Sequence, residues 1–351
     1  MNNQNKIQLA LPRIIDQQSN NILVLAADIG GTKTNLGLFF SNDGAMELKH
    51  EASYHSNQFS SFNAIMQQFL AETKNELPDR ISIGVSGPIL NNKVHTTNLL
   101  WEIESNDLLK ETKVKEVALI NDLEATAYGL AGLNEDDIIS IHNKESIVQG
   151  NCAIIAPGTG LGEAGLFWDG KYYHPFATEG GHCNFAPQTD LDIELYRYLK
   201  QSHEQVSWEH VACGPGIFNI YKFLRDVKKM QEPPWLKEEL NEDDPSKIID
   251  DCALKHSCEL CEETMQLFAR YLARESCNLV LKLKATGGLF FGGGIPPKIK
   301  QYLETDDFYK AFQQSDRMEI LMQSIPIKII MNNKTALIGA AYFGAFGNNQ
   351  L

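Results

Sequence analysis

Apolar residues in this chain form short uninterrupted runs that alternate with segments of helical spacing. The runs at 22–27, 80–85, 117–120, 152–156 and 288–291 contain almost no polar residue, which is typical of strands buried on both faces. Apolar residues recur with helical spacing at 62–70, 191–199, 218–228, 262–283 and 335–346. Strands that alternate with helices in this way predict an α/β fold.

Glycine-rich turns follow three of the apolar runs. Such turns expose backbone N–H groups with no Cβ in front of them, so they can hold phosphate oxygens. One turn alone is weak support, but three of them favour a nucleotide site. The strand–turn–strand unit occurs twice, about 130 residues apart, which predicts a duplicated unit and two lobes. The residues expected to hold the nucleotide are Asp28, Gly30, Gly31, Thr32, Gly158, Thr159, Gly160, Gly162, Gly293 and Gly294.

Asp122 lies where a predicted strand, 117–120, meets a predicted helix, 123–129. Open α/β sheets bind their ligands at this end of their strands. The alternative is that Asp122 only caps its helix, a common role of aspartate. Capping would explain Asp122 but not the glycine turns.

A second group of polar residues lies in the segment 178–187. Glu179 and His182 flank a double glycine there, and carboxylate and imidazole groups together suit the vicinal hydroxyls of a sugar. Taken alone, His182 would more often be a structural histidine. Glu209, ahead of a Gly-Pro-Gly segment, and Asn98 are further single candidates.

Two motifs have simpler explanations than the sites they resemble. Residues 165–171 have the glycine spacing of a P-loop, but Tyr172 follows where Ser or Thr is needed, so a hairpin turn is favoured. Cys258 and Cys261 have a zinc-like spacing without a second pair, and we interpret them, with Cys252, as packing residues.

Composition narrows the choice of ligand and surroundings. The 351 residues can form two lobes, and a net charge of −14 with a pI of about 5.1 disfavours nucleic acid as a partner. Seven scattered cysteines favour a reducing compartment, and no apolar run has the length of a membrane span. Residues 1–20 are interpreted as a flexible leader and residues 232–246 as an acidic surface excursion.

The order and spacing of these motifs resemble those of bacterial glucokinases from about residue 22 to the C-terminal helix. The matching segments are Asp28-Ile29-Gly30-Gly31-Thr32, Asn121-Asp122, Gly158-Thr159-Gly160-Leu161-Gly162, Glu179-Gly180-Gly181-His182, Glu209 before Gly214-Pro215-Gly216, and Gly292-Gly293-Gly294-Ile295. The similarity is to the branch without the zinc-binding cysteine cluster. It implies a two-lobed actin/hexokinase-like (ribonuclease H-like) fold with the active site in the interlobe cleft. The small lobe would be 21–131 plus 332–351, and the large lobe 132–331.

The resemblance also implies an activity, phosphorylation of glucose at its 6-hydroxyl by ATP with Mg²⁺, the entry step of glycolysis. Asp122 would be the catalytic base, and Asn98, Asn121, Glu179, His182 and Glu209 would bind the sugar, together with Asp122. Expected partners are glucose and ATP, with a homodimer as a further expectation, no nucleic acid, no membrane and a cytoplasmic location. Two alternatives stay open: a kinase for another hexose, such as fructose or mannose, and a non-catalytic sugar or nucleotide sensor.

Overall fold

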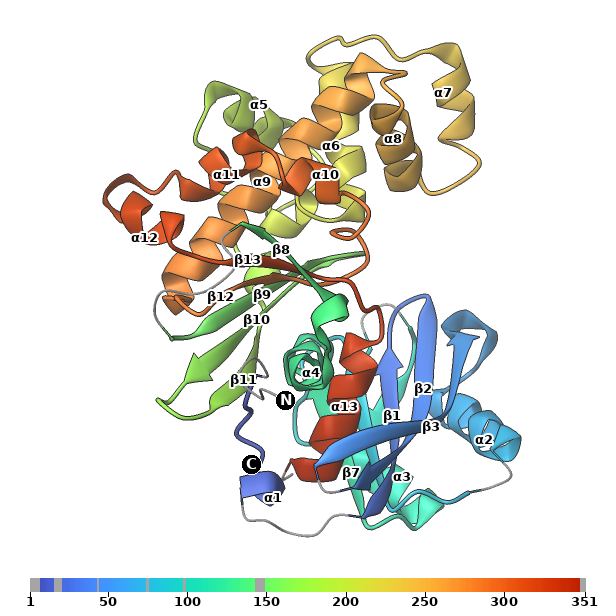
Figure 1. Ribbon diagram of the computed structural model, residues 1–351. Helices are drawn as coiled ribbons and strands as arrows, with labels where there is room; N and C mark the ends of the chain where they lie inside the picture. Colours follow the sequence, from blue (N-terminus) through green and yellow to red (C-terminus); the bar gives the residue numbers. More distant parts are fainter. Residues whose placement is uncertain are drawn as a thin grey trace. The chain divides into compact units, whose positions relative to one another are not determined.

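The apolar runs of the sequence are strands of two sheets in the computed structural model of the protein (Figure 1). The structure describes residues 7–15, 21–42, 44–73, 76–96, 99–142 and 149–347. The chain divides into two compact units. The first comprises Met1–Ile138, Ala164–Ala177 and Asn332–Leu351, and the second Ile139–Glu163 and Thr178–Met331.

The first unit is organised around a sheet with the strand order β3-β2-β1-β4-β7. β1 and β2 form the predicted antiparallel hairpin, whereas β1, β4 and β7 run parallel. Parallel strands have their carboxyl ends at one edge, where a ligand can be met by several loops. The strands of this sheet are β1 (Ile22–Ile29), β2 (Lys33–Asn42), β3 (Ala45–His55), β4 (Arg80–Val85) and β7 (Glu116–Asn121), and β5 (Lys93–His95) pairs with β6 (Glu102–Glu104) in a small sheet of their own.

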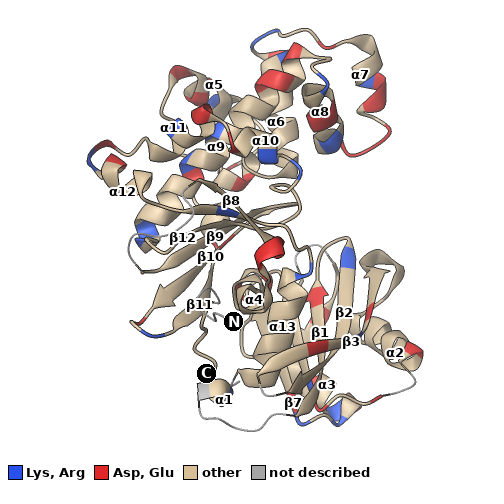
Figure 2. Cartoon of the chain, in the orientation of Figure 1, with Lys and Arg blue, Asp and Glu red and all other residues tan. Residues whose placement is uncertain are grey.

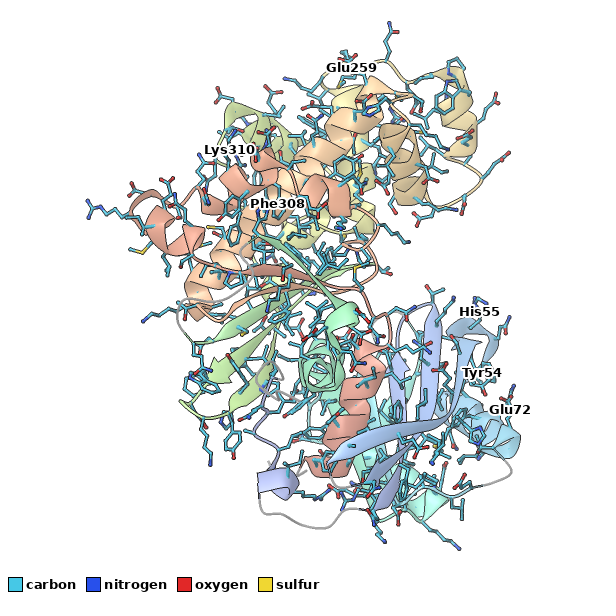
Figure 3. The ribbon with its side chains drawn as sticks, viewed as in Figure 1. Tyr54, His55, Glu72, Glu259, Phe308 and Lys310 are labelled. Atoms are coloured by element: carbon cyan, nitrogen blue, oxygen red, sulfur yellow. The ribbon has the colours of Figure 1, made fainter. Side chains whose placement is uncertain are left out.

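Helices cover both faces of this sheet. The core on one face contains Phe62 and Phe69 of α2 (Phe62–Glu72) and Leu108 of α3 (Ser105–Thr112). On the other face α13 (Thr335–Phe346) places Leu337 and two alanines against β1 and β2. The hydroxyl of Tyr54 on β3 also donates to Glu72 of α2 at 2.8 Å (Figure 3).

The helix α4 (Asp122–Gly129) packs closely on α13. A Cβ added to Gly339 of α13 would overlap the carbonyl oxygen of Ala125, and one added to Gly129 would overlap the carbonyl oxygen of Thr335. Glycine at both positions lets the two helix backbones approach one another. The predicted close packing of the last helix on this unit is confirmed.

Residues 7–15 differ from the expected flexible leader. Leu11 is 1% exposed, and the backbone N–H of Ala10 donates to the carbonyl of Tyr173 at 2.8 Å. Arg13, in α1 (Pro12–Ile15), forms an ion pair with Glu116 at 2.7 Å. Apolar burial and backbone pairing therefore fix this segment, and the interpretation was wrong for it because Leu9 and Leu11 are core residues.

The other sheet has the strand order β11-β10-β9-β12-β13-β8. β12 pairs in parallel with both β9 and β13, so the carboxyl ends of these strands also share an edge. The strands are β8 (Ile138–His142), β9 (Cys152–Pro157), β10 (Leu161–Trp168), β11 (Tyr173–Thr178), β12 (Gly288–Phe291) and β13 (Ile327–Ile330). The predicted hairpin turn at Asp169 and Gly170 joins β10 to β11, and Gly170 has φ = 100°.

The core of the second unit surrounds α9 (Glu259–Leu283), the long helix expected at 262–283. Phe308 of α11 packs in this core (Figure 3). Cys252, Cys258 and Cys261 are buried within it, as expected for packing residues. The remaining helices are α5 (Asp190–Leu199), α6 (Gly214–Asp226), α7 (Pro234–Glu239), α8 (Pro245–Leu254), α10 (Lys300–Leu303), α11 (Asp306–Gln313) and α12 (Glu319–Gln323).

The acidic excursion is partly helical. It contains α7 and leads into α8, and acidic side chains lie on both helices (Figure 2). Across the described ranges, no helix combines the length and apolar character needed to span a membrane.

Candidate functional site

Asp28 and Asp122 lie at the same edge of the sheet in the first unit. Asp28 is paired with Gly84 of β4, and Gly84 with Ile120 of β7. Neighbouring strands are about 4.8 Å apart, so Asp28 and the end of β7 are separated by about 10 Å. The carboxyl edge of three parallel strands thus presents Asp28, the first glycine turn and the start of α4 together.

Helix α4 is capped by Asn121 rather than by Asp122. The side-chain Oδ1 of Asn121 accepts from the N–H groups of Leu123 at 2.9 Å and Glu124 at 3.3 Å. Asp122 is the first helical residue, and its Oδ1 accepts from the N–H of Leu123 at 2.9 Å. The alternative in which Asp122 serves as the cap is therefore wrong, because the preceding asparagine has that role.

The first glycine turn, Gly30, Gly31 and Thr32, joins β1 to β2 and is held by neighbouring polar groups. The hydroxyl of Ser56 donates to the carbonyl of Gly30 at 3.1 Å, and the N–H of Ser56 donates to the carbonyl of Thr32 at 3.0 Å. Burial raises the pKa of Asp28, and a hydrogen bond from Asn35 at 3.2 Å opposes the shift. A half-buried carboxylate in this environment is a group that a nearby cation stabilises.

The other two glycine turns meet in the second unit. The N–H of Gly292 donates to Ile155 at 2.9 Å, and a Cβ on Gly293, which has φ = 79°, would lie 2.7 Å from the carbonyl oxygen of Pro157. Between the turns is a cavity of about 920 Å³, within the range of small-molecule sites. Its walls include Gly158, Thr159, Gly214, Pro215, Asp244, Ser246, Asp250, Gly294 and Lys298.

The end of the acidic excursion contributes to this cavity, which the sequence did not indicate. Asp244 caps α8 by accepting from the N–H of Ser246 at 3.0 Å, and Asp250 lies further along the same helix. Burial and the neighbouring carboxylate of Asp251 raise the pKa of Asp250 to about 6. Its Oδ1 is buried without a hydrogen-bond partner among the described residues. Such an oxygen can accept a hydrogen bond from a bound molecule.

Glu179 and His182 bound a short turn that packs on the start of β10. The N–H of His182 donates to the carbonyl of Glu179 at 3.1 Å, which closes the turn Gly180–His182. A Cβ on Gly181 would overlap the carbonyl oxygen of Leu161, so only glycine permits this approach. We call the segment Thr178–His182 the sugar loop, after the role that the sequence predicts for Glu179 and His182.

Glu209 connects the second glycine turn with the sugar loop. Its Oε2 accepts from the N–H of Leu161 at 2.9 Å and would lie 2.5 Å from a Cβ on Gly160. Leu161 is also the residue on which Gly181 packs. Gly162, grouped with the turn in the sequence, lies within β10. Within the second unit, Leu161, which follows the cavity-lining turn, therefore also contacts the sugar loop.

Burial lowers the pKa of His210, which follows Glu209, and the neighbouring His203 adds to this shift. The rings of the two histidines are 4.1 Å apart. The Nδ1 of His210 accepts from the N–H of Ser207 at 3.0 Å, which fixes the short turn Trp208–His210. A neutral imidazole suits this position, since it accepts from a backbone donor.

Many classes of enzyme bind a nucleotide at glycine-rich turns, and comparison of this sequence with known proteins identifies the class. Residues 25–345 match the family model described as Glucokinase. The chain belongs to the glucokinase family. A glucokinase of Nostoc sp. is 38% identical over 338 residues, which cover 92% of this chain and 99% of the relative. Glucokinases phosphorylate glucose with ATP, and the chain is an enzyme of this type.

Solved structures of glucokinases support the fold. The glucokinase from an Antarctic psychrotroph has a TM-score of 0.78 and 30% identity, covering 92% of this chain and 98% of that one. The glucokinase of Balamuthia mandrillaris, solved with glucose, has a TM-score of 0.75 and 20% identity, covering 93% and 94% of the two chains. The expected α/β fold of the two-lobed actin/hexokinase-like class is confirmed.

The predicted residues of this glucokinase fall into separate groups in the two units. The first unit holds Asp28, the first glycine turn, Asn121 and Asp122 at one sheet edge. The second unit holds the other two glycine turns, Glu179, His182 and Glu209, and Leu161 contacts both Glu209 and Gly181. Asn98 lies outside the described residues.

Proposed function

We propose that this glucokinase transfers the γ-phosphoryl group of ATP to the 6-hydroxyl of glucose, giving glucose 6-phosphate and ADP, with Asp122 as the base. The observation that supports it most is the pair of contacts made by Leu161. This residue follows the turn that lines a nucleotide-sized cavity, and its backbone contacts both Glu209 and the sugar loop. A kinase needs a sugar subsite next to a phosphate subsite. The glycine turn and the sugar loop, which both contact Leu161, would supply these two subsites within one unit.

Asp122 is the carboxylate that orients the attacking hydroxyl and accepts its proton. It stands at the carboxyl edge of the sheet, in the first turn of α4, with one oxygen held by the N–H of Leu123. Asn121 is the N-cap of α4, so capping alone does not account for an aspartate at position 122. Phosphoryl transfer needs no protein nucleophile, so correct placement of the carboxylate is enough.

Glu179, His182 and Glu209 bind the sugar hydroxyls, and Asn98 and Asn121 add to them. Carboxylates accept from hydroxyl groups, whereas an asparagine amide can donate to them. The Oδ1 of Asn121 is already engaged by two backbone N–H groups, so its NH₂ group is the part that would serve the sugar.

The glycine turns bind the phosphates of ATP through backbone N–H groups, and the cavity takes the nucleoside. Mg²⁺ bound to the phosphates would neutralise the charge that develops during transfer. The carboxylate of Asp28 fits this cation, because burial raises its pKa and, among the described residues, its hydrogen bond from a side chain comes from Asn35. Asp28 would therefore face the metal and hold it through water.

Glucose is the acceptor that we propose, in preference to other hexoses. The relatives at up to 38% identity are named glucokinases, and the Balamuthia enzyme was solved with glucose. The test is a phosphorylation assay over glucose, mannose and fructose with ATP and Mg²⁺. If kcat/KM is higher for mannose or fructose than for glucose, that hexose is the preferred acceptor. If no hexose is phosphorylated, the sensor alternative is favoured.

Two further expectations belong to this proposal. A homodimer is tested by the mass in sedimentation at several protein concentrations. A cytoplasmic location is supported by the seven cysteines, which are free and, apart from the exposed Cys183, buried.

A further inference from the structure

Two buried glutamates lie beneath the sugar loop. Glu163 of β10 is 1% exposed and Glu275 of α9 is fully buried. Their carboxyl groups are near enough for the charge of Glu275 to raise the pKa of Glu163. Two neighbouring carboxylates repel each other because each is only an acceptor, whereas one proton lets one carboxyl group donate to the other. Full burial of two adjacent acidic residues is rare unless they have partners.

The charges around the pair balance when it holds one proton. Asn278 donates to Glu275 Oε2 at 2.8 Å, and the ammonium of Lys282 lies 3.4 Å from Oε1. Among the described residues, the charged groups acting on Glu163 are Glu275 and Lys282, both on α9. The two carboxyl groups of Glu163 and Glu275 therefore have one neighbouring cation, Lys282. One proton leaves Glu163 neutral and Glu275 paired with Lys282, whereas loss of that proton leaves a surplus buried negative charge.

Glu163 contacts the middle of the sugar loop. A Cβ on Gly180 would overlap Oε2 of Glu163, so the loop backbone rests against the carboxyl group. The hydroxyl of Thr178 donates to the carbonyl oxygen of Glu163 at 3.1 Å and accepts from the N–H of Gly180 at 3.2 Å. Oε1 of Glu163 is buried without a hydrogen-bond partner in the described part of the chain. An unpartnered oxygen is tolerated far better on a neutral carboxyl group than on an anion.

We propose that Glu163 is a positioning residue of the sugar loop: the proton it shares with Glu275 keeps Gly180 seated, and loss of this proton in alkaline solution weakens glucose binding. The inference rests on the proposed roles of Glu179 and His182, which flank Gly180. Burial raises the pKa of Glu163 to about 8, with the charge of Glu275 adding to the shift. Because Glu163 is protonated below this value, glucose affinity is full at neutral pH and falls as the pH rises through about 8.

The test is the dissociation constant of glucose measured by calorimetry from about pH 7 to about pH 9.5. For one shared proton, we expect Kd to rise above pH 8 with a slope approaching about tenfold per pH unit. Glu163→Gln is neutral at every pH and its amide can donate to Glu275. It should keep the affinity of the unchanged protein at pH 7 within about threefold and lose the slope, since no proton remains to be released.

Two other variants make the test specific. Glu124→Gln is the control, because burial raises the pKa of Glu124, on α4 in the first unit, to about 7. It should keep the slope. Glu275→Gln removes one negative charge next to Glu163 and should move the midpoint of the Kd rise to lower pH. If Glu163→Gln does not fold, the midpoint measured for Glu275→Gln tests the role of Glu163 instead.

A flat Kd in the unchanged protein overturns the inference, as does a slope that persists in Glu163→Gln or is lost equally in Glu124→Gln. An unchanged midpoint in Glu275→Gln also overturns it. Failure of the proposed function is a separate result: glucose would then not be phosphorylated at any pH. If glucose is phosphorylated but its Kd does not depend on pH, only the role of Glu163 is refuted.

Discussion

Replacing Gly160 with alanine should weaken glucose binding, although Gly160 belongs to a turn that we assign to ATP. The new Cβ would lie 2.5 Å from Oε2 of Glu209, closer than real Cβ contacts allow. The carboxylate would have to move, and Oε2 is the atom that accepts from the N–H of Leu161 at 2.9 Å. The substitution therefore displaces Glu209, which we propose to bind the sugar, from the donor that orients its carboxylate.

The size of the effect follows from that hydrogen bond. A hydrogen bond to a charged group contributes about 1.5–3 kcal/mol. Each 1.4 kcal/mol changes a dissociation constant about tenfold, so the Kd of glucose should rise by about 10- to 150-fold. The lower value applies if the carboxylate finds water as a replacement donor.

Gly158→Ala is a matched control in the same turn. No atom lies within 4 Å of a Cβ built at Gly158, so this variant leaves Glu209 undisturbed while placing a methyl group at the cavity. Calorimetry with glucose and, separately, with a non-hydrolysable ATP analogue should show that Gly158→Ala affects only the nucleotide. Glucose affinity in Gly160→Ala within about twofold of the unchanged protein, with thermal unfolding unaltered, would refute the reasoning.

Three other substitutions test the site and the core. Asp122→Asn should lower kcat by about 10²- to 10⁴-fold in steady-state assays while glucose affinity is retained, since an amide cannot accept the proton; near-normal turnover would remove Asp122 as the base. Asp250→Ala should raise the KM for ATP about tenfold and leave the KM for glucose unchanged, because Asp250 lines the cavity that we propose for the nucleotide; a KM for ATP equal to that of the unchanged protein would contradict this role. Asp192→Ala should lower the free energy of unfolding in urea by about 3–5 kcal/mol, because it leaves Arg274, bound at 2.6 Å, without its buried partner; a change below about 1 kcal/mol would contradict this.

Features that depend on neighbouring residues could be predicted from the sequence. The glycine turns follow their strands directly, and the helix 335–346 was expected with the bounds that the structure has. These predictions succeeded because burial pattern and turn chemistry act over a few residues. The β10–β11 hairpin was likewise predicted from Asp169 and Gly170 against a P-loop spacing.

Contacts between distant segments could not be predicted. The excursion at 232–246 was interpreted as a surface segment, yet Asp244 lines the cavity between the glycine turns because α8 packs on α6 and α9. In the sequence, Glu163 is a single polar residue in a predicted strand. Its neighbour Glu275 lies on α9, and the packing of this helix brings the two together. Leu9 and Leu11 looked like a loose segment because a short apolar stretch does not reveal its partner.

The close approach of α4 and α13 also constrains how the protein is made. About 200 residues separate the two helices along the chain, and a ribosome adding about 5–20 residues per second needs about 10–40 s to cover that distance. Until α13 emerges, the surface of α4 around Ala125 and Gly129 and the outer side of β1 lack their helical partner, so the nascent first unit exposes apolar surface next to Asp122. Chaperone binding to this intermediate, or premature termination shortly before Thr335, would therefore affect the phosphoryl-transfer machinery encoded far upstream.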